Sequence, residues 1–334
     1  MRFLITGGAG FIGLNLVKFI LSKKNHEILI LDKVTYASNF DYLETLLDSN
    51  KNITFQKVDV SDFDSVSTAI DKFRPHKIMH LAAETHVDRS ISNSNIFLKS
   101  NIIGTYTMLE ASKIFYEKLG KDEKQEFIFH HISTDEVFGD LSFDDVPFLE
   151  TSPYKPSSPY AASKASADHL VRAWSRTYRL PSVITNCSNN YGPFQHREKL
   201  IPLCIDNALK GIEIPIYGDG LQIRDWLYVW DHAEALYEVA TNGNVGETYN
   251  IGSNNELTNI SVVKLICDLL DREIIKKPKN IRSFHDLIKH VSDRPGHDLR
   301  YAINPSKINN HLNWTAKTSF EEGILTTIKW YIKD

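Results

Sequence analysis

The N-terminus reads Phe3-Leu4-Ile5-Thr6-Gly7-Gly8-Ala9-Gly10-Phe11-Ile12-Gly13, a short apolar strand that runs into a glycine-rich turn and then a helix. Glycines at 7, 10 and 13 permit a close turn, let the backbone approach a pyrophosphate and allow the helix to pack tightly. The N-terminus of the helix then faces the phosphates. This stretch therefore predicts a dinucleotide-binding unit at the start of the chain.

Asp32 ends the second predicted strand, 19 residues beyond Gly13. A carboxylate at this place accepts the ribose hydroxyls of NAD and repels the extra phosphate of NADP. Lys33, directly after it, works against that distinction. NAD is nevertheless the cofactor that we expect.

Two further strand ends are candidates for cofactor contacts. Asp59 and Val60 follow the third predicted strand and would reach the adenine, although Asp59 could equally cap the next helix, a role for which Asp62 competes. The run Leu81-Ala82-Ala83-Glu84 follows the fourth strand and supplies small residues where the cofactor must pass.

Short apolar runs alternate with longer amphipathic segments through the first half of the chain, which is typical of parallel strands joined by helices. The strands are expected at residues 3–6, 28–31, 53–57, 77–82, 127–132 and 182–185. The helices are expected at residues 11–23, 62–72, 96–119 and 159–178. The polar stretch 118–126 is expected to be a solvated connection. The fold class is α/β, a Rossmann-type doubly wound parallel sheet with a smaller mixed α/β lobe.

The regular alternation stops after residue 186, where proline, glycine, asparagine and aromatic residues become frequent up to residue 226. Residues 229–251 return to the earlier pattern, with a helix near 231–240 and a strand at 248–251. We therefore expect an NAD-binding domain of residues 1–186 plus 227–252. Residues 187–226 plus 253–334 would form a lobe that binds the substrate.

Composition excludes several classes of protein. The chain has 334 residues and a net charge of −4, so a nucleic-acid-binding surface is not expected. Its three cysteines have no metal-ligand spacing, and we expect no metal site and reduced, packed thiols. No apolar run approaches the roughly 18 to 20 residues of a membrane span, and no secretion signal precedes the first strand. A cytoplasmic protein without membrane contact is expected.

The candidate chemical site combines two segments. Ser133, Thr134, Asp135 and Glu136 follow the fifth apolar run, and Tyr160 comes 26 residues after Thr134. Ser158 and Pro159 predict the start of a helix on which Lys164 lies one turn beyond Tyr160. A nearby ammonium is expected to lower the pKa of the phenol. Tyr and Lys suit a nicotinamide-dependent oxidation, and the adjacent carboxyls suit loss of water.

Longer strings extend this pattern over nearly the whole chain. They are His80-Leu-Ala-Ala-Glu-Thr-His-Val-Asp-Arg-Ser90, His131-Ile-Ser-Thr-Asp-Glu-Val-Phe-Gly-Asp140, Asn186-Cys-Ser-Asn-Asn-Tyr-Gly-Pro193, Gln222-Ile-Arg-Asp-Trp-Leu-Tyr228 and Asp293-Arg-Pro-Gly-His-Asp298. Together with the cofactor motif they resemble the dTDP-glucose 4,6-dehydratase family of the extended short-chain dehydrogenase/reductase superfamily.

The resemblance implies a role for each catalytic residue. Tyr160 would take the proton of the sugar O4 while hydride leaves C4 for NAD, with Lys164 lowering the pKa of Tyr160 and contacting the nicotinamide ribose. Thr134 would hydrogen-bond O4. Glu136 would remove the C5 proton and Asp135 would protonate the departing C6 hydroxyl, giving a 4-keto-6-deoxy sugar. Both carboxyls can face the sugar only if the chain leaves the sheet at this point, since neighbours on a strand point oppositely.

The resemblance also implies the binding residues. For the cofactor they are Gly7, Gly10, Phe11, Ile12, Gly13, Asp32, Lys33, Thr35, Asp59, Val60, Leu81, Ala82, Ala83, Ser100, Tyr160, Lys164 and Asn190. For the nucleotide sugar they are Thr85, Thr134, Asn189, Glu198, Lys199, Leu200, Pro215, Tyr217, Arg224, Asn259, Arg294 and His297. Arg224 would bridge the diphosphate, or else pair with Asp225, and Tyr217 would stack on the base or fill the core.

Two departures from the family pattern stand out: Phe138 replaces a usual Tyr, and Gln195-His196-Arg197 replaces a more aromatic stretch beside the nucleotide pocket. A nucleotide-sugar 4-epimerase, a dehydratase of a UDP-, CDP- or GDP-hexose, and a catalytically silent NAD-binding scaffold or redox sensor stay open as alternatives. The apolar surplus of residues 96–119 and 159–178, with the resemblance, suggests a homodimer built as a four-helix bundle.

Overall fold

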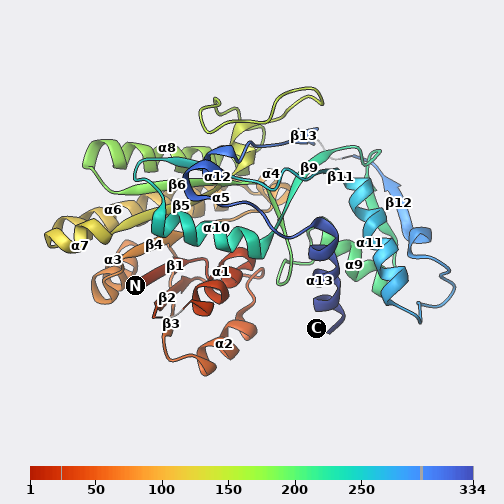
Figure 1. Cartoon of the computed structure of the whole chain (residues 1–334), viewed down its shortest axis with the longest axis horizontal. Coiled ribbons are helices and arrows are strands. Elements are labelled where there is room, and N and C mark those ends of the chain that lie inside the picture. Colours follow the sequence, from red (N-terminus) through yellow and green to blue (C-terminus); the bar gives the residue numbers. More distant parts are fainter. Residues whose placement is uncertain (24, 294–295, 334) are drawn as a thin grey trace.

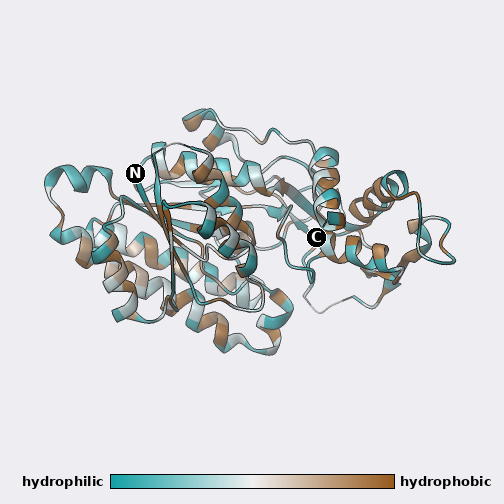
Figure 2. Ribbon diagram, turned by 90° about the horizontal axis from the view of Figure 1, so that it is seen from below, coloured by the Kyte–Doolittle hydropathy of each residue, from teal (hydrophilic) through white to brown (hydrophobic). Residues whose placement is uncertain are grey.

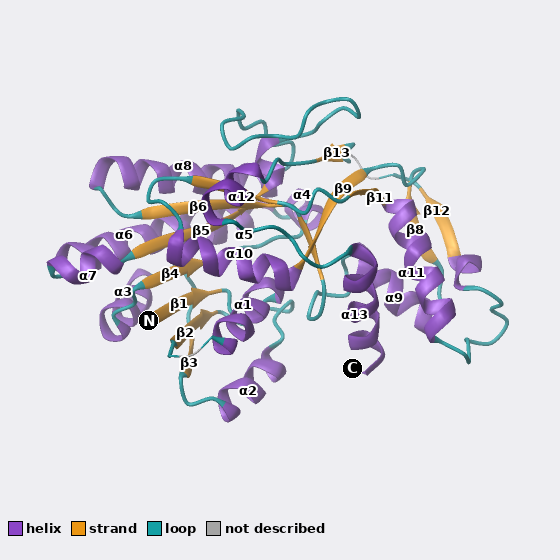
Figure 3. Ribbon diagram, in the orientation of Figure 1, coloured by secondary structure: helices purple, strands orange, loops and turns teal. Residues whose placement is uncertain are grey.

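A seven-stranded parallel sheet forms the centre of the protein (Figure 1 and Figure 3). The computed structural model describes residues 1–23, 25–293 and 296–333. The strand order is β3-β2-β1-β4-β5-β6-β10. The strands are β1 (Arg2–Thr6), β2 (Glu27–Asp32), β3 (Ile53–Lys57), β4 (Lys77–His80), β5 (Ile128–Thr134), β6 (Ser182–Cys187) and β10 (Thr248–Ile251). This order reverses between β1 and β4, as in a Rossmann fold, so the predicted fold class is confirmed.

Both faces of the sheet are covered because successive side chains of a strand point to opposite sides. Phe3 and Ile5 of β1 pack into one apolar cluster, whereas Leu4 between them packs into another. The first cluster is closed by α1 (Phe11–Ser22), α10 (Val229–Asn242) and α12 (Ser306–Leu312). The second is closed by α3 (Phe63–Phe73), α6 (Gly104–Lys118) and α8 (Pro159–Tyr178). Figure 2 shows the hydrophobic residues concentrated on the sheet between these helices.

Three local features differ from the predictions. The helix expected over residues 96–119 is interrupted, because α5 (Ser94–Phe97) continues into a π-helical segment η1 (Leu98–Ile103) before α6 begins. The expected connection at 118–126 contains a short helix, α7 (Lys121–Glu126). The sequence did not predict this helix because the segment has no apolar periodicity. Two helices, α2 (Phe40–Ser49) and α4 (Val87–Ser92), were not predicted at all.

The second lobe lies at the right of Figure 1. It contains a four-stranded sheet in which β9 (Ile223–Tyr228) pairs with β7 (Asn189–Tyr191), β11 (Glu256–Thr258) and β13 (Arg300–Tyr301). A parallel pair joins β8 (Ile214–Tyr217) to β12 (Ile288–Val291), which η3 (Phe284–Leu287) precedes. The lobe has its own apolar core, shared by α9 (Leu200–Lys210), α11 (Asn259–Glu273) and α13 (Phe320–Lys333).

The three cysteines, Cys187, Cys204 and Cys267, are buried and free, as expected. Among the residues that the structure describes, no helix combines the length and the apolar character that crossing a lipid bilayer requires.

Candidate active site

A cavity opens where the carboxyl ends of the parallel strands meet. It has a volume of about 310 Å³ and is lined by residues that follow β1, β2, β4, β5 and β6. Ligands of doubly wound sheets bind at this edge, close to the point where the strand order reverses. The fold therefore gathers motifs that are distant in the sequence into one site.

The glycine-rich turn has no space for side chains at two of its positions. A Cβ atom on Gly13 would lie 2.1 Å from the carbonyl oxygen of Gly7, and one on Gly7 would lie 2.8 Å from the backbone nitrogen of Ala82. Gly7 also has a positive φ of 72°. Helix α1 begins after Gly10 without a side-chain cap, which leaves its first N–H groups available to an anion. The turn fits the pyrophosphate of a dinucleotide.

Asp32 lies at the cavity and also supports the glycine-rich turn. Its carboxylate accepts hydrogen bonds from the backbone N–H groups of Ala9 (3.0 Å) and Val34 (2.8 Å). Burial raises the pKa of Asp32, and these two backbone donors oppose the rise. Lys33, which argued against NAD, forms an ion pair with Glu84 at 3.0 Å, so its charge is compensated within the protein.

Every predicted cofactor residue except Asp59 lines the cavity. The Asp59 carboxylate instead accepts hydrogen bonds from the backbone and hydroxyl of Ser61, while its neighbours Val58 and Val60 face the cavity. Asp62, not Asp59, caps α3 by accepting a hydrogen bond from the backbone of Ser65. The competition over the helix cap is therefore decided for Asp62.

The chain leaves the sheet directly after Thr134. This change of direction is what allows two adjacent carboxyl side chains to face the same cavity. Asp135 begins a short 3₁₀-helix, η2 (Asp135–Phe138), and the following Gly139 has a positive φ of 94°. Both Asp135 and Glu136 consequently line the cavity. Phe138 points the other way and is buried against the rings of Phe148 and Tyr154.

Asp135 is buried with little to support a negative charge. Its Oδ1 accepts a hydrogen bond from the Thr134 hydroxyl (3.2 Å), and its Oδ2 has no hydrogen-bond partner among the described residues. Burial, followed by the neighbouring Glu136 carboxylate, raises the pKa of Asp135 well above its usual value. The environment therefore favours a protonated Asp135 that can act as an acid.

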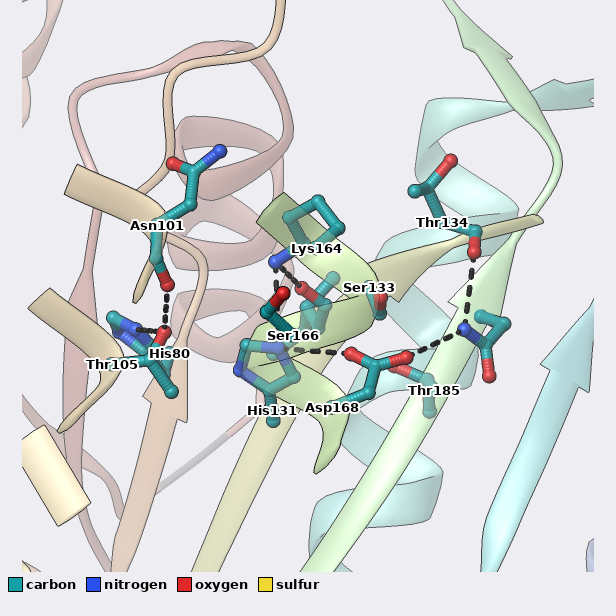
Figure 4. Close-up of polar contacts among 12 residues, drawn as sticks. His80, Asn101, Thr105, His131, Ser133, Thr134, Lys164, Ser166, Asp168 and Thr185 are labelled. Carbon is teal, nitrogen blue, oxygen red and sulfur yellow. Dashed lines mark hydrogen bonds and ion pairs between the residues drawn. The ribbon is translucent and has the colours of Figure 1, made fainter. Parts of the chain in front are cut away.

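Helix α8 brings Tyr160 and Lys164 to the same wall. Ser158 caps the helix by accepting a hydrogen bond from the backbone of Ala161 (3.0 Å), as the sequence predicted. The expected lowering of the Tyr160 pKa is wrong for this structure: burial and then the Glu136 charge raise it well above the usual value. The Lys164 ammonium donates to the Ile132 carbonyl (2.8 Å) and lies beside His131 (Figure 4).

The predicted nucleotide-sugar residues fall into two groups. Thr85, Thr134, Asn189, Glu198 and Lys199 line the cavity. Leu200, Pro215, Tyr217, Arg224, Asn259 and His297 do not line it. Arg294 lies outside the described residues. Five of the eleven described residues therefore line the cavity, and three of these, Asn189, Glu198 and Lys199, come from the segment expected to form the second lobe.

Two open alternatives in the lobe can be followed further. Asp225 accepts hydrogen bonds from Ser253 and Asn255, while the Arg224 guanidinium donates to the Asp298 carbonyl (2.9 Å) and lies 4.4 Å from the Tyr301 ring centre. Tyr217 is 44% exposed, so it does not fill the core.

Sequence reasoning did not assign several residues that line the cavity. Gln195 and His196, noted only as departures, are among them, as are Cys187 and Ser188 at the end of β6. The strand-end rule used for the other motifs also applies to β6, so Cys187 and Ser188 could have been found. Gln195 and His196 lie in the connection between β7 and α9, and only the folded chain brings this connection to the cavity.

Comparisons with known proteins agree with this geometry. The sequence model of the family described as GDP-mannose 4,6 dehydratase matches residues 4–327. The dTDP-glucose 4,6-dehydratase of Neisseria gonorrhoeae is 53% identical over 329 residues, which covers 98% of this chain and 95% of that protein. The dTDP-glucose 4,6-dehydratase of Bacillus anthracis in complex with NAD has a TM-score of 0.87 and 41% identity, covering 100% of this chain and 97% of that one. The Streptomyces venezuelae dTDP-glucose 4,6-dehydratase, also with NAD bound, has a TM-score of 0.89 and 38% identity, covering 100% and 98%.

Proposed function

The chain belongs to the dTDP-glucose 4,6-dehydratase family of the extended short-chain dehydrogenases/reductases, and on this basis we propose that it converts dTDP-glucose to dTDP-4-keto-6-deoxyglucose and water. It is an NAD-dependent hydro-lyase. The observation that carries the proposal is the meeting of Thr134, Asp135, Glu136, Tyr160 and Lys164 in the cavity that begins at the glycine-rich turn. NAD, when bound, supplies the hydride acceptor for C4, the hydride donor for C6 and a positive ring charge that favours a nearby phenolate.

The residues that hold NAD lie at the strand ends of the sheet. The glycine-rich turn and the uncapped start of α1 receive the pyrophosphate, Asp32 receives the adenosine ribose, and Leu81, Ala82 and Ala83 form the floor. The crowding at Gly7 and Gly13 supports this assignment, because a side chain at either position would collide with the backbone of Ala82 or Gly7 and prevent the close turn.

Tyr160 accepts the O4 proton in the oxidation step. Tyr160 and Thr134 line the same cavity, and the Thr134 side chain opposes the rise of the Tyr160 pKa. Burial raises the Tyr160 pKa, so the phenolate depends on positive charge nearby. Lys164, one helical turn further along α8, is the cation that the protein contributes to that wall.

The two adjacent carboxyls divide the elimination. Glu136 removes the C5 proton, which the C4 ketone makes acidic, and the protonated Asp135 gives a proton to the departing O6. The raised pKa of Asp135, caused by burial and by Glu136, supports this division of roles. A 4-epimerase needs no such acid and base, so the presence of both carboxyls in the cavity disfavours that alternative.

Counting protons reveals a further requirement of each turnover. Tyr160 gains the O4 proton, Asp135 loses one to water, and Glu136 returns its proton to C5. Tyr160 therefore ends with one proton more than at the start, and Asp135 with one fewer. The Thr134 hydroxyl donates to Asp135 (3.2 Å) and lies in the same cavity as Tyr160, so it is placed to pass this proton and restore the starting state.

The division of labour between the two parts of the chain is also part of the proposal. Residues 1–186 plus 227–252 bind NAD, and residues 187–226 plus 253–334 bind the nucleotide. Strand β10 supports this division because it completes the central sheet after the chain has passed through the second lobe. Arg224 and Tyr217 would contact the diphosphate and the base of the bound substrate.

We further propose a homodimer in which two helices from each protomer form a four-helix bundle. Exposed apolar residues lie along the segment from α5 to the start of α6, namely Ile96, Leu98, Ile103 and Tyr106, and Tyr178 is exposed near the end of α8. Pairing two such surfaces would remove them from water. A cytoplasmic location, where nucleotide sugars are made, accompanies this proposal.

The test is incubation of the purified protein with dTDP-glucose and, separately, with UDP-, CDP- and GDP-glucose. The expected product shows the alkali-induced absorbance of a 4-keto sugar with dTDP-glucose, and deuterium placed at C4 of the substrate appears at C6. The Tyr160→Phe protein is the inactive control. Formation of a C4 epimer, or preference for another nucleotide, would overturn the assignment of reaction or substrate respectively.

A further inference from the structure

Helix α8 carries a second polar pair behind the one that the reaction uses. Tyr160, Lys164, Asp168 and Arg172 follow one another at intervals of four residues, so they share one face of the helix. Asp168 is completely buried, and the proposed reaction assigns it no task. A buried carboxylate is costly to maintain, so its contacts merit a close reading.

Lys164 and Asp168 are linked through a histidine on the neighbouring strand (Figure 4). The Nζ atom of Lys164 lies 3.4 Å from Nε2 of His131, and that same Nε2 lies 3.2 Å from Oδ1 of Asp168. Nε2 of His131 thus lies between the buried Lys164 ammonium and the buried Asp168 carboxylate.

The other oxygen of Asp168 has donors from two different segments. Tyr154 donates its hydroxyl hydrogen to Oδ2 at 2.7 Å, and Arg172 in turn donates to the Tyr154 oxygen at 2.7 Å. Asn186 of β6 donates both to Oδ2 (3.3 Å) and to the Thr134 carbonyl oxygen (3.1 Å). Asp168 is therefore connected to the helix of Tyr160 and Lys164 and also to the strand end that carries the acid and base.

We propose that Asp168 is a positioning residue for this reaction: acting through His131 it keeps the Lys164 ammonium charged at the cavity wall, and acting through Asn186 it holds that wall in register with the Thr134 turn. This inference rests on the proposed dehydratase function. It assigns Asp168 to no contact with substrate or cofactor.

The charges around Lys164 determine the sign of the effect. The groups that face it are Asp168 on its own helix, His131 on β5, the Cys187 thiol at the end of β6, and His80 on β4, whose pKa is lowered first by burial and then by His131 and Lys164. Burial lowers the pKa of Lys164 to about 8, and Asp168 is the largest influence that raises it. Without that charge, Lys164 loses its proton at a lower pH.

The first experiment compares the pH profile of kcat/KM for the parent with that of Asp168→Asn. The alkaline limb is expected to move to lower pH by about one unit, a roughly ten-fold loss above the limb, with KM for the nucleotide sugar little changed. Asp231→Asn is the matched control, because Asp231 is also buried and hydrogen-bonded but lies on α10, bonded to Lys317 and Thr318. An unmoved limb in Asp168→Asn would overturn the proposal even if the rate falls.

A second pair of variants covers the case in which Asp168→Asn does not fold. His130 and His131 are adjacent, completely buried residues of β5, but His130 contacts Thr185 instead of Lys164. His131→Leu is expected to shift the limb in the same direction by a smaller amount, since it strips the polar bridge from Lys164. His130→Leu should leave the limb in place. Equal shifts in both variants would contradict the proposal.

A measurement without turnover separates this inference from the proposed function. Trace acetylation with acetic anhydride across a pH series, followed by peptide mass spectrometry, reports when the Lys164 amine loses its proton, with exposed Lys51 as the internal reference. Earlier deprotonation in Asp168→Asn supports the inference even if no nucleotide sugar is converted. Identical acetylation curves would overturn it, whatever the substrate proves to be.

Discussion

Two buried aspartates, Asp135 in the turn after β5 and Asp168 on α8, have pKa values that are shifted in opposite directions. Asp135 in the turn has one hydroxyl donor and a negative neighbour, and burial raises its pKa well above the usual value. Asp168 on α8 is also buried, and burial alone would raise its pKa. The influences of His131, Lys164 and Tyr154 outweigh burial and lower that pKa. Burial is thus common to both regions, and the partners decide which carboxyl stays protonated.

In the proposed reaction, the difference separates a reactive region from a supporting one. In the turn, the poorly compensated Asp135 carboxyl would give up a proton during each turnover. On α8, the compensated Asp168 carboxylate would stabilise a neighbouring cation without changing its own protonation state. Charge compensation, more than depth of burial, therefore distinguishes groups that react from groups that position others.

The largest expected effect comes from Glu136→Gln. Removing the base should lower the rate of dehydration by about a thousand-fold, while oxidation at C4 continues, so reduced cofactor accumulates on the enzyme. Stopped-flow absorbance of reduced nicotinamide with dTDP-glucose measures this. Dehydration at the parental rate would show that the turn supplies its base from another residue.

Asp135→Asn should lower dehydration by about a hundred-fold, because the departing hydroxyl loses its acid. In contrast to the previous variant, Glu136 still removes the C5 proton, so C5 of the bound sugar should exchange with deuterated water. Mass spectrometry of recovered sugar distinguishes the two variants. Absence of exchange in Asp135→Asn would place the acid and base roles the other way round.

Thr134→Val tests the link between Tyr160 and Asp135. If the hydroxyl returns the proton after each cycle, later turnovers should be slower than the first by about ten-fold, less than the roughly hundred-fold that a general acid or base contributes at the low end. Rapid-quench measurement should then show a burst of one product per site. Thr134→Ser, which keeps the hydroxyl, is the control and should show no burst. A Val variant slowed equally in all turnovers would limit Thr134 to binding O4.

The last expected effect concerns the free energy of unfolding, and its sign differs between the two aspartates. Asp135 has a raised folded-state pKa, so its contribution is present at low pH and is lost as pH rises through that value. Asp168 has a lowered one, so its contribution is present above the unfolded value of 3.8 and is lost as pH falls through the folded value.

At neutral pH, Asp135→Asn should therefore raise the free energy of unfolding by about 1 kcal/mol. Asp168→Asn should lower it by about 3 kcal/mol, because it leaves a buried cation uncompensated. Chemical denaturation at pH 7 and pH 4 measures both, and the gap between the variants should narrow at the lower pH. Shifts of the same sign would remove the distinction between the regions.

The sequence by itself determined the parallel sheet, the glycine-rich turn and the convergence of the candidate catalytic residues at one edge of the sheet. Gly7, Gly13, Thr134 and Tyr160 belong to local motifs at strand ends or helix starts, and a parallel sheet brings all its carboxyl ends to one edge. The long sequence motifs, such as residues 131–140 and 222–228, indicated the family. The short helix α7 and the π-helical segment escaped prediction because neither follows the apolar periodicity of a regular helix.

Only the tertiary structure decided the state of the charges. His131 lies 37 positions from Asp168, and Tyr154 and Asn186 approach that carboxylate from two other segments, so no local pattern announces the compensation. The raised pKa of Tyr160, which burial and Glu136 cause, has the same origin. An acid strength depends on burial and on every group within a few ångströms, and chain folding alone brings those groups together.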